Sequence, residues 1–527
     1  MKKEYVDVAI VGYGPIAKML GSLLGKKGWK VGIYEKFVEP YRLPRAVAMD
    51  DEIARILQGA VPSAKLEKLF DAAGGEMYNW YNADRELLLS IPFEKEGVSG
   101  WPGELFFNQP SLEKEMDQTC SNLSSVRIHY GSEVIDIAEK EESVELTVKE
   151  HSGEERKVIA NYTVGCDGAN SIVREHMEHT VTDLNFAYDF LVVDIIPKGK
   201  SELPVIMQIC DPTRPTTVVS GGPGRRRWEF MVLPNESKEE ISQEEYIWKL
   251  LEPWNHTPEN SIVERTAVYT FKALWVDNWR KGRTMIAGDA AHLTPPFMGQ
   301  GMCSGIRDAA NLAWKLDLVL KGKSNEDILD TYTEERKPHN QKVVHAALYL
   351  GEMICVNDPK KAKERDDAFF SGKVPPFPAF PILTDGILYQ PEEEKKDNLA
   401  GKLSFQSKVG YQNKVGLFDD VVGTGWTIIS PVQNPRELLS NTQLQFLNEL
   451  DATCIEISSV EEDGKDTVVD VTGKYSEYFE ENGIEAVIIR PDYYIFGSTS
   501  EVSKVSDLVE ALASQFKKYM NTVTVQS

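Results

Sequence analysis

The first forty residues alternate between apolar strands and a helix-like stretch. Residues 6–11 are a short apolar run, residues 16–27 have a helical pattern, and residues 30–35 form a second strand-like run that ends at Glu35. A strand, a helix and a second strand in this order are typical of a parallel α/β unit. The sequence therefore predicts an α/β fold that begins near the N-terminus.

A second helix is predicted near residue 300. Its apolar residues recur at steps of three and four, the spacing of one buried helix face; they are Met302, Ile306, Ala309, Ala313, Leu316 and Leu320. The preceding stretch 295–302 is rich in proline and glycine, so it predicts a loop that leaves the first amides of the helix unbonded. Those amides lie at the positive end of the helix dipole, which favours negative charge.

Alternating apolar positions predict two further groups of strands. Residues 126–164 alternate as in a small antiparallel sheet, and residues 180–275 contain several strand-like runs. We therefore predict one discontinuous domain, 1–179 with 276–390, and a β-sheet domain at 180–275 inserted into it. Within the first of these, Ser111 is predicted to cap a helix.

The last part of the chain is predicted to be a separate domain at 410–527. The charged run 392–397 before it is predicted as a linker or loop. Beyond it the pattern predicts strands and a final helix, at 426–429, 453–457, 486–489, 493–496 and 502–519. Cys454 has no Cys-x-x-Cys partner, so dithiol exchange is excluded there, and structural support or subunit contact is the expected role.

Composition narrows the possible partners and the compartment. The net charge is −24, with 58 basic against 82 acidic residues, which disfavours nucleic acid and anionic membranes as bulk partners. The cysteines are far apart and lack metal-type spacing, which is typical of a reducing cytoplasm and predicts neither disulfides nor a metal site. No apolar run approaches the roughly 18 residues of a membrane span, so no anchor is predicted.

The strand at 6–11 runs directly into a glycine motif. Gly12-Tyr13-Gly14-Pro15-Ile16-Ala17 is G-x-G-x-x-G/A at a strand-to-helix junction, where the glycines permit a tight turn and close approach to a pyrophosphate. Glu35, followed by Lys36, lies where an acid would bind a ribose. The motif predicts a dinucleotide site; the alternative is a glycine-rich turn in an unrelated α/β unit.

The loop before the second helix has the residues of a flavin site. Ala287 to Ala291 are small except for Asp289, so backbone can approach a ligand while the carboxylate accepts a hydrogen bond from a hydroxyl. The amides that follow Gly299 are placed to stabilise the charge that collects on a reduced flavin. The alternative is a glycine- and proline-rich loop that caps an ordinary core helix.

Several polar residues have two interpretations. Asp50 and Asp51 precede a helical pattern and are either helix caps or functional acids, and Gln109 lies in a turn or contacts a cofactor. Four arginines make part of the 180–275 region basic, so one of them is a candidate partner for a substrate carboxylate, while a solvated face explains the others; they are Arg214, Arg225, Arg226 and Arg227. His292 is assigned a structural role.

Three ordered motifs resemble those of a known family. The glycine motif at Gly12, the DG-x-x-S-x-V-R stretch from Asp167 to Arg174, and the GD stretch at Gly288 occur in this order in single-component FAD-dependent aromatic hydroxylases of the p-hydroxybenzoate hydroxylase type. Further segments are most similar to those of 3-(3-hydroxyphenyl)propionate hydroxylases and their relatives: PRAVAMDDE, FNQP-x-LE, CDPTRPTT, GPGRRRWEF, PPFMGQGMCSGIRDAANLAWKL, ICVNDP and FDDVVGTGW. The resemblance spans nearly the whole chain.

The resemblance implies a fold and a set of site residues. The fold would be a Rossmann-like FAD-binding domain, an inserted β-sheet substrate domain at 180–275, and a thioredoxin-like C-terminal domain at 410–527. The implied FAD-binding residues come from all three motifs and the loops between them: Gly12, Gly14, Pro15, Ile16, Ala17, Glu35, Lys36, Arg45, Gln109, Asp167, Gly288, Asp289, Pro296, Gly299, Gln300, Gly301 and Met302. Tyr13, Pro15 and Ile16 depart from the smaller residues usual in the family, which affects only local packing.

The resemblance also implies an activity. NADH or NADPH would reduce FAD, and O₂ would form a C4a-hydroperoxide that is attacked by an electron-rich phenolic ring, such as a hydroxyphenylpropionate-like acid. Asp50 is the candidate base, with Tyr188, Tyr269 and bound water as alternatives, and the candidate substrate residues are Tyr188, Arg214, Arg225, Phe230 and Pro295.

Other functions stay open at this stage. A related flavin monooxygenase that acts on an antibiotic or polyketide is the first alternative, and a non-catalytic nucleotide-sensing flavoprotein is the second. A flavin halogenase is disfavoured because the sequence lacks Trp-x-Trp-x-x-Pro. A homodimer remains compatible with the sequence.

Overall fold

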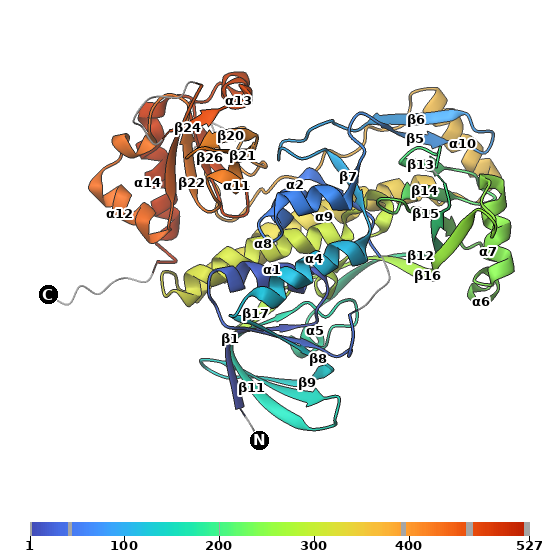
Figure 1. Ribbon diagram of the computed structural model, residues 1–527, viewed down its shortest axis with the longest axis horizontal. Helices are drawn as coiled ribbons and strands as arrows, with labels where there is room; N and C mark the ends of the chain where they lie inside the picture. Colours follow the sequence, from blue (N-terminus) through green and yellow to red (C-terminus); the bar gives the residue numbers. More distant parts are fainter. Residues whose placement is uncertain (1–2, 41–44, 200, 391–396, 460–466, 521–527) are drawn as a thin grey trace.

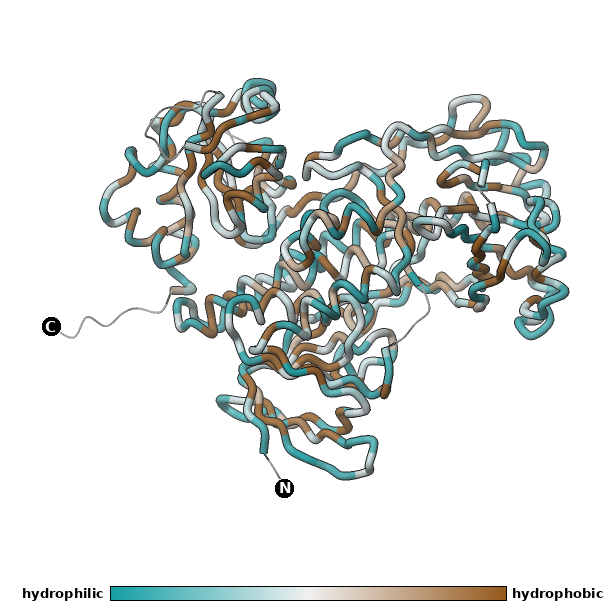
Figure 2. The backbone as a smooth tube through the Cα atoms, viewed as in Figure 1, coloured by the Kyte–Doolittle hydropathy of each residue, from teal (hydrophilic) through white to brown (hydrophobic). Residues whose placement is uncertain are grey.

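Three parts of the chain lie side by side in the computed structural model, which describes residues 3–40, 45–199, 201–390, 397–459 and 467–520. Figure 1 shows a central α/β domain with the N-terminus, a green β-sheet region to one side of it and an orange-red C-terminal domain to the other. Hydrophobic segments concentrate inside each part, and hydrophilic segments lie outside (Figure 2). Among the described helices, none has both the length and the apolar character that crossing a membrane requires.

The central domain is organised around β1 (Lys3–Val11), which pairs in parallel with two neighbours. Its sheet has the order β17-β18-β11-β1-β2-β8, with β10 and β9 attached through β11. The other strands are β2 (Val31–Glu35), β8 (Val126–Tyr130), β9 (Ser132–Glu139), β10 (Val144–Glu150), β11 (Glu155–Gly165), β17 (Arg280–Lys281) and β18 (Thr284–Ile286). The predicted strand, helix and strand at the N-terminus are therefore present.

The antiparallel strands predicted at 126–164 are present as β9, β10 and the first part of β11, but β8 is not one of them. β8 pairs in parallel with β2 and belongs to the main sheet. One edge of β11 pairs with β1, and its other edge pairs with β10 at residues 155–160 and with β18 at residues 163–165. Because one strand serves both sets of partners, the antiparallel strands extend the same sheet.

Long helices pack against this sheet and against each other. They are α1 (Pro15–Lys26), α4 (Gln109–Asn122), α8 (Gln300–Leu320) and α9 (Asp330–Ile354), with α2 (Asp51–Gln58), α3 (Ser63–Leu66), α5 (Ile172–His176) and α10 (Pro359–Phe370) as shorter or peripheral helices. A Cβ atom on Gly305 would lie 2.5 Å from Cγ1 of Ile16, so this glycine allows α1 and α8 to touch. The predicted cap Ser111 is wrong: Asn108 caps α4 and accepts a bond from the Ser111 amide, because the helix begins earlier, at Gln109.

The β-sheet region has the strand order β19-β16-β12-β15-β14-β13-β5-β6. Its strands are β5 (Met77–Tyr81), β6 (Leu87–Pro92), β12 (Val181–Pro197), β13 (Ile206–Ile209), β14 (Thr216–Ser220), β15 (Arg226–Met231), β16 (Ser261–Val276) and β19 (His292–Leu293). The predicted range 180–275 holds most of them but leaves out β5 and β6, which join through the parallel pairing of β13 with β5. Helices α6 (Lys238–Ile241) and α7 (Glu244–Leu251) lie beside this sheet, and β3 (Ala48–Asp50), β7 (Glu104–Phe107) and β4 (Phe70–Ala72) form a small separate sheet.

The C-terminal domain contains a mixed sheet with the order β21-β20-β24-β23-β22-β25-β26. Its elements are β20 (Lys408–Tyr411), β21 (Lys414–Leu417), α11 (Phe418–Val421), β22 (Thr427–Ser430), α12 (Asn441–Glu449), β23 (Thr453–Ser458), β24 (Val468–Asp470), α13 (Lys474–Asn482), β25 (Ala486–Ile489), β26 (Ile495–Thr499) and α14 (Val505–Phe516). The last strand begins two residues later than predicted, because Tyr493 has a positive φ of 68° and forms a turn. Of the predicted linker, 392–396 lies outside the described residues.

Candidate active site

A cavity of about 830 Å³ lies where the three parts meet. Many predicted cofactor residues line it, together with the candidate base: Gly14, Pro15, Ile16, Arg45, Asp50, Gln109, Asp289, Pro296, Gly299, Gln300, Gly301 and Met302. The other predicted cofactor residues are not part of the described lining: Gly12, Ala17, Glu35, Lys36, Asp167 and Gly288. The fold thus brings the three sequence motifs to one site.

The turn between β1 and α1 is open on its cavity side. Gly12 has a φ of 91°, and a Cβ atom there would lie 2.6 Å from the Cys166 carbonyl oxygen, so only glycine fits. A Cβ atom on Gly14 would meet nothing within 4 Å, and no side chain caps α1. Glu35 ends the neighbouring strand and accepts a 2.8 Å bond from the Tyr13 amide. This turn therefore presents free backbone amides to the cavity.

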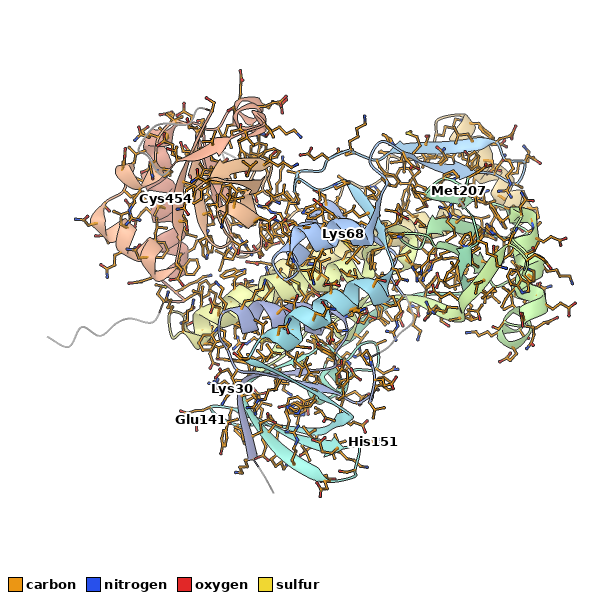
Figure 3. All side chains as sticks on the ribbon, viewed as in Figure 1. Lys30, Lys68, Glu141, His151, Met207 and Cys454 are labelled. Atoms are coloured by element: carbon orange, nitrogen blue, oxygen red, sulfur yellow. The ribbon has the colours of Figure 1, made fainter. Side chains whose placement is uncertain are left out.

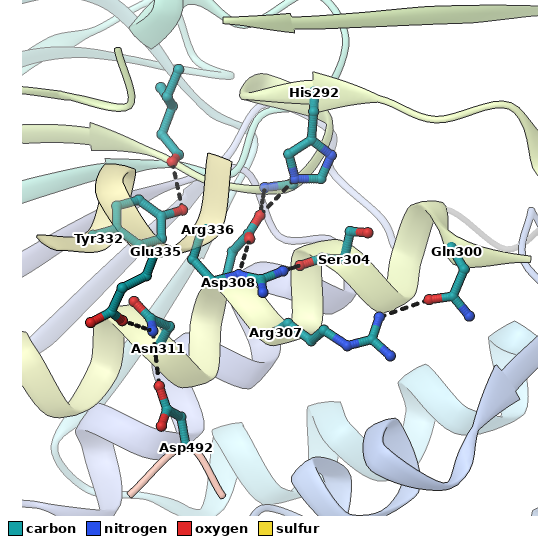
Figure 4. A network of polar contacts seen from close by, with 12 residues as sticks. His292, Gln300, Ser304, Arg307, Asp308, Asn311, Tyr332, Glu335, Arg336 and Asp492 are labelled. Atoms are coloured by element: carbon teal, nitrogen blue, oxygen red, sulfur yellow. Dashed lines mark hydrogen bonds and ion pairs between the residues drawn. The ribbon is translucent and has the colours of Figure 1, made fainter. Parts of the chain in front are cut away.

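The N-terminus of α8 faces the same cavity. Gly299, with a φ of 67°, precedes the helix, and no side-chain cap occupies its first amides. Behind it, Asp308 accepts bonds from the Gly288 amide at 3.1 Å and from Arg336 at 3.0 Å, and pairs with His292 at 2.8 Å (Figure 4). Burial acts to raise the pKa of Asp308, but His292 and Arg336 hold it below its ordinary value. His292 is thus fully buried and paired with Asp308, which is consistent with the structural role assigned to it.

The middle motif connects the other two. Asp167 accepts bonds from the Ser171 hydroxyl at 2.5 Å and the Val173 amide at 3.3 Å. Arg174 donates to the carbonyl oxygen of Ala290 at 3.2 Å, which ties this motif to the loop of Asp289. Burial raises the pKa of Asp289, and His292 and Arg45 oppose the shift.

Gln109 fixes the loop that carries Arg45. Its Oε1 accepts bonds from the Arg45 amide at 2.8 Å and the Ala46 amide at 2.7 Å, and its Nε2 donates to Glu113 at 2.7 Å. Because Gln109 also lines the cavity, it shapes the wall as well as holding the loop. Gln109 is therefore more than a turn residue, because it holds the Arg45 loop and forms part of the cavity wall.

Asp50 lies in a network of buried charges at the cavity wall. Its Oδ1 caps α2 by accepting a 3.0 Å bond from the Ile53 amide, and its Oδ2 accepts bonds from Gln300 and Arg307. Arg307 also donates to Glu52 at 2.6 Å and to Gln300 at 2.7 Å. Asp50 is thus a helix cap that also lines the cavity, and its interpretation as a functional acid stays a prediction.

Two further acids at this wall have raised pKa values. Burial, together with the nearby charge of Asp50, raises the pKa of Asp51 to about 7. The same two causes raise the pKa of Glu104 well above its ordinary value. This part of the cavity is therefore already rich in carboxyl groups and resists further negative charge.

The predicted substrate residues do not line the cavity: Tyr188, Arg214, Arg225, Phe230 and Pro295. Arg214 pairs with Glu236, and Arg225 pairs with Glu264 at 2.9 Å. In β15, Arg227 and Glu229 face the cavity, whereas Phe230 packs in a separate apolar cluster with Trp228.

Alternation along β15 explains the position of Phe230. Neighbouring side chains of a strand point to opposite faces, so Phe230 lies on the face opposite Arg227 and Glu229. Arg225 precedes this strand and is held by Glu264 instead. The cavity wall on this sheet is formed instead by residues that the prediction did not select as substrate contacts: Tyr78, Ile91, Phe93, Ile206, Gln208, Thr217, Val219, Arg227, Glu229, Tyr269 and Phe271. Alternation places Arg227 and Glu229 on one face of β15, but it does not distinguish Arg227 from Arg225.

The C-terminal domain also reaches the cavity. Leu403 and Tyr494 line it, beside Phe380, Pro381 and Ile382 from the preceding segment. Cys454 lies elsewhere in this domain (Figure 3), and burial raises its pKa to about 11, against the opposing effect of Arg436. The expectation that the tail gives only structural support or subunit contact is therefore incomplete.

Comparisons with known proteins agree with this geometry. Residues 5–347 match the FAD binding domain family, and residues 401–515 match the HcaD C-terminal domain. A probable NADH-specific resorcinol 4-hydroxylase of Rhodococcus jostii is 33% identical over 97% of this chain and 95% of its own. A 3-(3-hydroxy-phenyl)propionate/3-hydroxycinnamic acid hydroxylase of Mycolicibacterium smegmatis is 31% identical over 94% of this chain and 90% of its own.

The chain belongs to the family of FAD-dependent aromatic hydroxylases. It is thus an FAD- and NAD(P)H-dependent monooxygenase. The flavin-dependent monooxygenase PieE, in complex with FAD and substrate, has a TM-score of 0.80 and 17% identity over 98% of this hydroxylase and 99% of its own chain. Aklavinone-11 hydroxylase, in complex with FAD and aklavinone, has a TM-score of 0.77 and 20% identity over the same shares. At these identities the two structures show a shared fold.

The residues of this hydroxylase fit FAD. Two helix N-termini without side-chain caps open onto one cavity, which suits the pyrophosphate at one and the reducible ring at the other. Asp289 lies between the two helix N-termini in the sequence, and its carboxylate can accept a hydrogen bond from a hydroxyl group of the cofactor. The structure thus supplies the backbone donors and the acceptor that such a cofactor requires.

Replacing Asp289 with Ala should weaken FAD binding. A hydrogen bond to a charged acceptor contributes about 1.5–3 kcal/mol, and its loss leaves a hydroxyl without its partner. The variant should be purified with less bound flavin, measured by visible absorbance and by titration with FAD. Asp327→Ala, at an exposed acid away from the cavity, is the matched control. Full flavin content and unchanged affinity in Asp289→Ala would make Asp289 a turn residue only.

Proposed function

We propose that this hydroxylase acts on a neutral phenolic ring, such as that of a dihydric phenol, with Asp50 as the base. The relatives named above act on two chemically different substrates, a neutral dihydric phenol and phenolic acids. The carboxylates that already pair with the cavity arginines Arg227 and Arg307 support the neutral class. The NADH specificity in the name of the Rhodococcus jostii relative supports NADH as the reductant.

Acidic groups outnumber basic groups at the cavity wall. The carboxyl-bearing residues there are Asp50, Asp51, Glu52, Glu104, Glu229 and Asp289, and the cationic residues among the described lining are Arg45, Arg227 and Arg307. Arg227 pairs with Asp194 through two bonds of 2.7 and 3.0 Å, and lies 3.7 Å from Glu229. Arg307 pairs with Asp50 and Glu52. These two arginines therefore already have carboxylate partners.

A substrate carboxylate would compete with the existing ion pairs of the cavity wall. Burying an ion without a partner costs several kcal/mol, and to pair with Arg227 or Arg307 a substrate acid would have to displace Asp194, Asp50 or Glu52. A phenol needs only hydrogen bonds and apolar contact. The aromatic walls at Tyr78, Phe93 and Phe271 supply that contact.

Asp50 is placed to manage the phenolic proton. A phenol has a pKa near 10 in water, yet the ring is most reactive toward oxygen transfer when its hydroxyl proton is being removed. Oδ1 of Asp50 accepts only the Ile53 amide among the described contacts, so it keeps a free lone pair. Bound FAD, when reduced, supplies the activation of O₂. The apolar walls hold the ring and exclude water from it.

The same proposal covers the domain assignments. The central domain would bind FAD, the sheet at 180–275 with β5 and β6 would cover the substrate, and the tail would be thioredoxin-like. In the tail, β22 pairs in parallel with β23 and antiparallel with β25, which pairs antiparallel with β26. With α12, α13 and α14 between and after these strands, this topology supports the thioredoxin-like assignment.

A panel of phenols that differ in charge tests the substrate class. We expect resorcinol and 3-(3-hydroxyphenyl)propan-1-ol to stimulate NADH oxidation and give hydroxylated product. The matched acid, 3-(3-hydroxyphenyl)propionate, should have a kcat/KM lower than that of the alcohol by at least about tenfold, equivalent to 1.4 kcal/mol. An acid preferred over its alcohol would contradict the neutral class. Failure of every phenol in the panel would contradict phenol hydroxylation itself.

A further inference from the structure

A buried turn of the C-terminal domain is anchored on the central helices. Arg490 donates to Glu335 of α9 at 2.6 Å and to Asp492 at 2.7 Å, and Asp492 accepts a 2.8 Å bond from Asn311 of α8. All of these side chains are buried. The contact between Asn311 and Asp492 is visible in Figure 4. The turn therefore has one fixed position relative to α8 and α9.

The anchored turn places Tyr494 at the cavity. Its hydroxyl donates a 2.8 Å bond to Oε1 of Glu52, although the two residues are 442 positions apart. Tyr494 and Glu52 are each 5% exposed, and both line the cavity. A charge-assisted hydrogen bond in such a buried place is stronger than one at the surface.

A continuous set of bonds leads from Tyr494 to Asp50. Oε2 of Glu52 accepts from Nε of Arg307 at 2.6 Å, and Nη2 of the same guanidinium donates to Oδ2 of Asp50. Nη1 of Arg307 donates to Oε1 of Gln300, the first residue of α8, at 2.7 Å. Because the guanidinium is planar, fixing Nε on Glu52 also fixes the directions of the other two nitrogens.

We propose that Tyr494, from the C-terminal domain, is a positioning residue that orients Asp50 through Glu52 and Arg307. The proposal rests on the proposed role of Asp50 as the base. The Tyr494 hydroxyl occupies one oxygen of Glu52 and leaves the other for Arg307, which keeps Arg307 directed at Asp50 and at Gln300. The C-terminal domain thus contributes to the reaction geometry, although it lacks paired cysteines.

Tyr494→Phe tests this role with little change in volume. It removes the hydroxyl and keeps the ring that packs near Leu383 and Leu388. Tyr493→Phe is the matched control, because Tyr493 is the neighbouring buried residue and does not line the cavity. The ring that lies 4.6 Å from the Arg55 guanidinium is retained in this control.

We expect Tyr494→Phe to bind FAD normally and to keep phenol-stimulated NADH oxidation with an unchanged KM for NADH. Its kcat for hydroxylated product should fall by about tenfold, a part of the 10²–10⁴ that a base contributes, with the lost product appearing as hydrogen peroxide. Tyr493→Phe should keep the full yield of product per NADH. Equal yields in wild type and Tyr494→Phe would overturn the proposal.

A double-mutant cycle distinguishes this proposal from the role of Asp50 itself. If Tyr494 acts through Asp50, then Tyr494→Phe should cause no further loss in an Asp50→Asn background, because residues that act as a unit are not additive. Multiplicative losses in the double variant would overturn the positioning role and leave the base intact. Full product yield in Asp50→Asn alone would instead overturn the base.

Discussion

Replacing Asp50 with Asn should slow hydroxylation by about 10²–10⁴-fold, the usual contribution of a positioned base. Asn keeps the size of the side chain and can still cap α2, because Asn and Asp are comparable N-caps, but it cannot take a proton. Arg307 keeps Glu52 as an ionic partner. The variant should therefore bind FAD and oxidise NADH when phenol is added, while most of the oxygen is released as hydrogen peroxide. Product and peroxide per NADH are the measurements.

A matched control variant distinguishes the role of Asp50 as a base from its role as a helix cap. Asp358 caps α10 by accepting bonds from the Lys360 and Lys361 amides at 2.9 Å, and it does not line the cavity. Asp358→Asn makes the same chemical change at a remote helix end and should leave product per NADH unchanged. A lowered melting temperature with full product yield in Asp50→Asn would make Asp50 a cap only. Tyr269, which lines the cavity, would then be the next candidate base.

Replacing Arg490 with Met should lower the free energy of unfolding by about 3–5 kcal/mol, the usual cost of removing one partner from a buried ion pair. Arg490 contacts Glu335 and Asp492, and all three side chains are at most 1% exposed. After the substitution Lys315 is the remaining cation that pairs with Glu335, and the other described donors to the two carboxylates are neutral: Asn311, Trp314 and the Ile387 amide. The variant should also lose product per NADH, because the turn that carries Tyr494 loses its anchor.

The pH dependence of the free energy of unfolding shows whether the ionised form of Glu335 stabilises the fold. Burial acts to raise the pKa of Glu335, but Arg490 and Lys315 lower it to about 2. Because the pKa of Glu335 is lower in the folded than in the unfolded chain, its ionised form stabilises the fold at pH values above the unfolded pKa, near 4.3. This stabilisation is lost as the pH falls from there toward 2. Arg490→Met should show less of this acid-dependent loss than the wild type.

An exposed ion pair provides the comparison for Arg490. Arg225 pairs with Glu264, and each side chain is nearly 30% exposed, so Arg225→Met should change stability by about 0–1 kcal/mol. Urea unfolding of both variants measures the difference. Equal, small losses in the two variants would contradict a buried network that holds the C-terminal domain in place.

Local sequence patterns predicted the parts of the site that local physics determines. The turn at Gly12 and Gly14 and the start of α8 follow from residue size, φ and helix period, and the structure contains both. Asp50 and Gln109, which were singled out where a strand or loop meets a helix, both line the cavity.

The rest depends on contacts between distant segments. The pairing of β13 with β5 and the bond from Tyr494 to Glu52 leave no local periodic signal. The choice between Arg225 and Arg227 had no local signal, because the two residues have the same strand parity. Arg225 precedes β15 and pairs with the distant Glu264, whereas Arg227 lies within the strand and lines the cavity. Buried networks such as that of Arg490 are also invisible to a pattern of polar and apolar residues.

The most direct test of the central claim is product analysis with isotopically heavy O₂. The purified holoenzyme would be given NADH and resorcinol, and the product would be examined by mass spectrometry. We predict one hydroxyl group added to the ring, with its oxygen derived from O₂, and about one NADH consumed per product. Consumption of NADH without any hydroxylated product, or a hydroxyl oxygen derived from water, would contradict the assignment of this chain as a phenol hydroxylase.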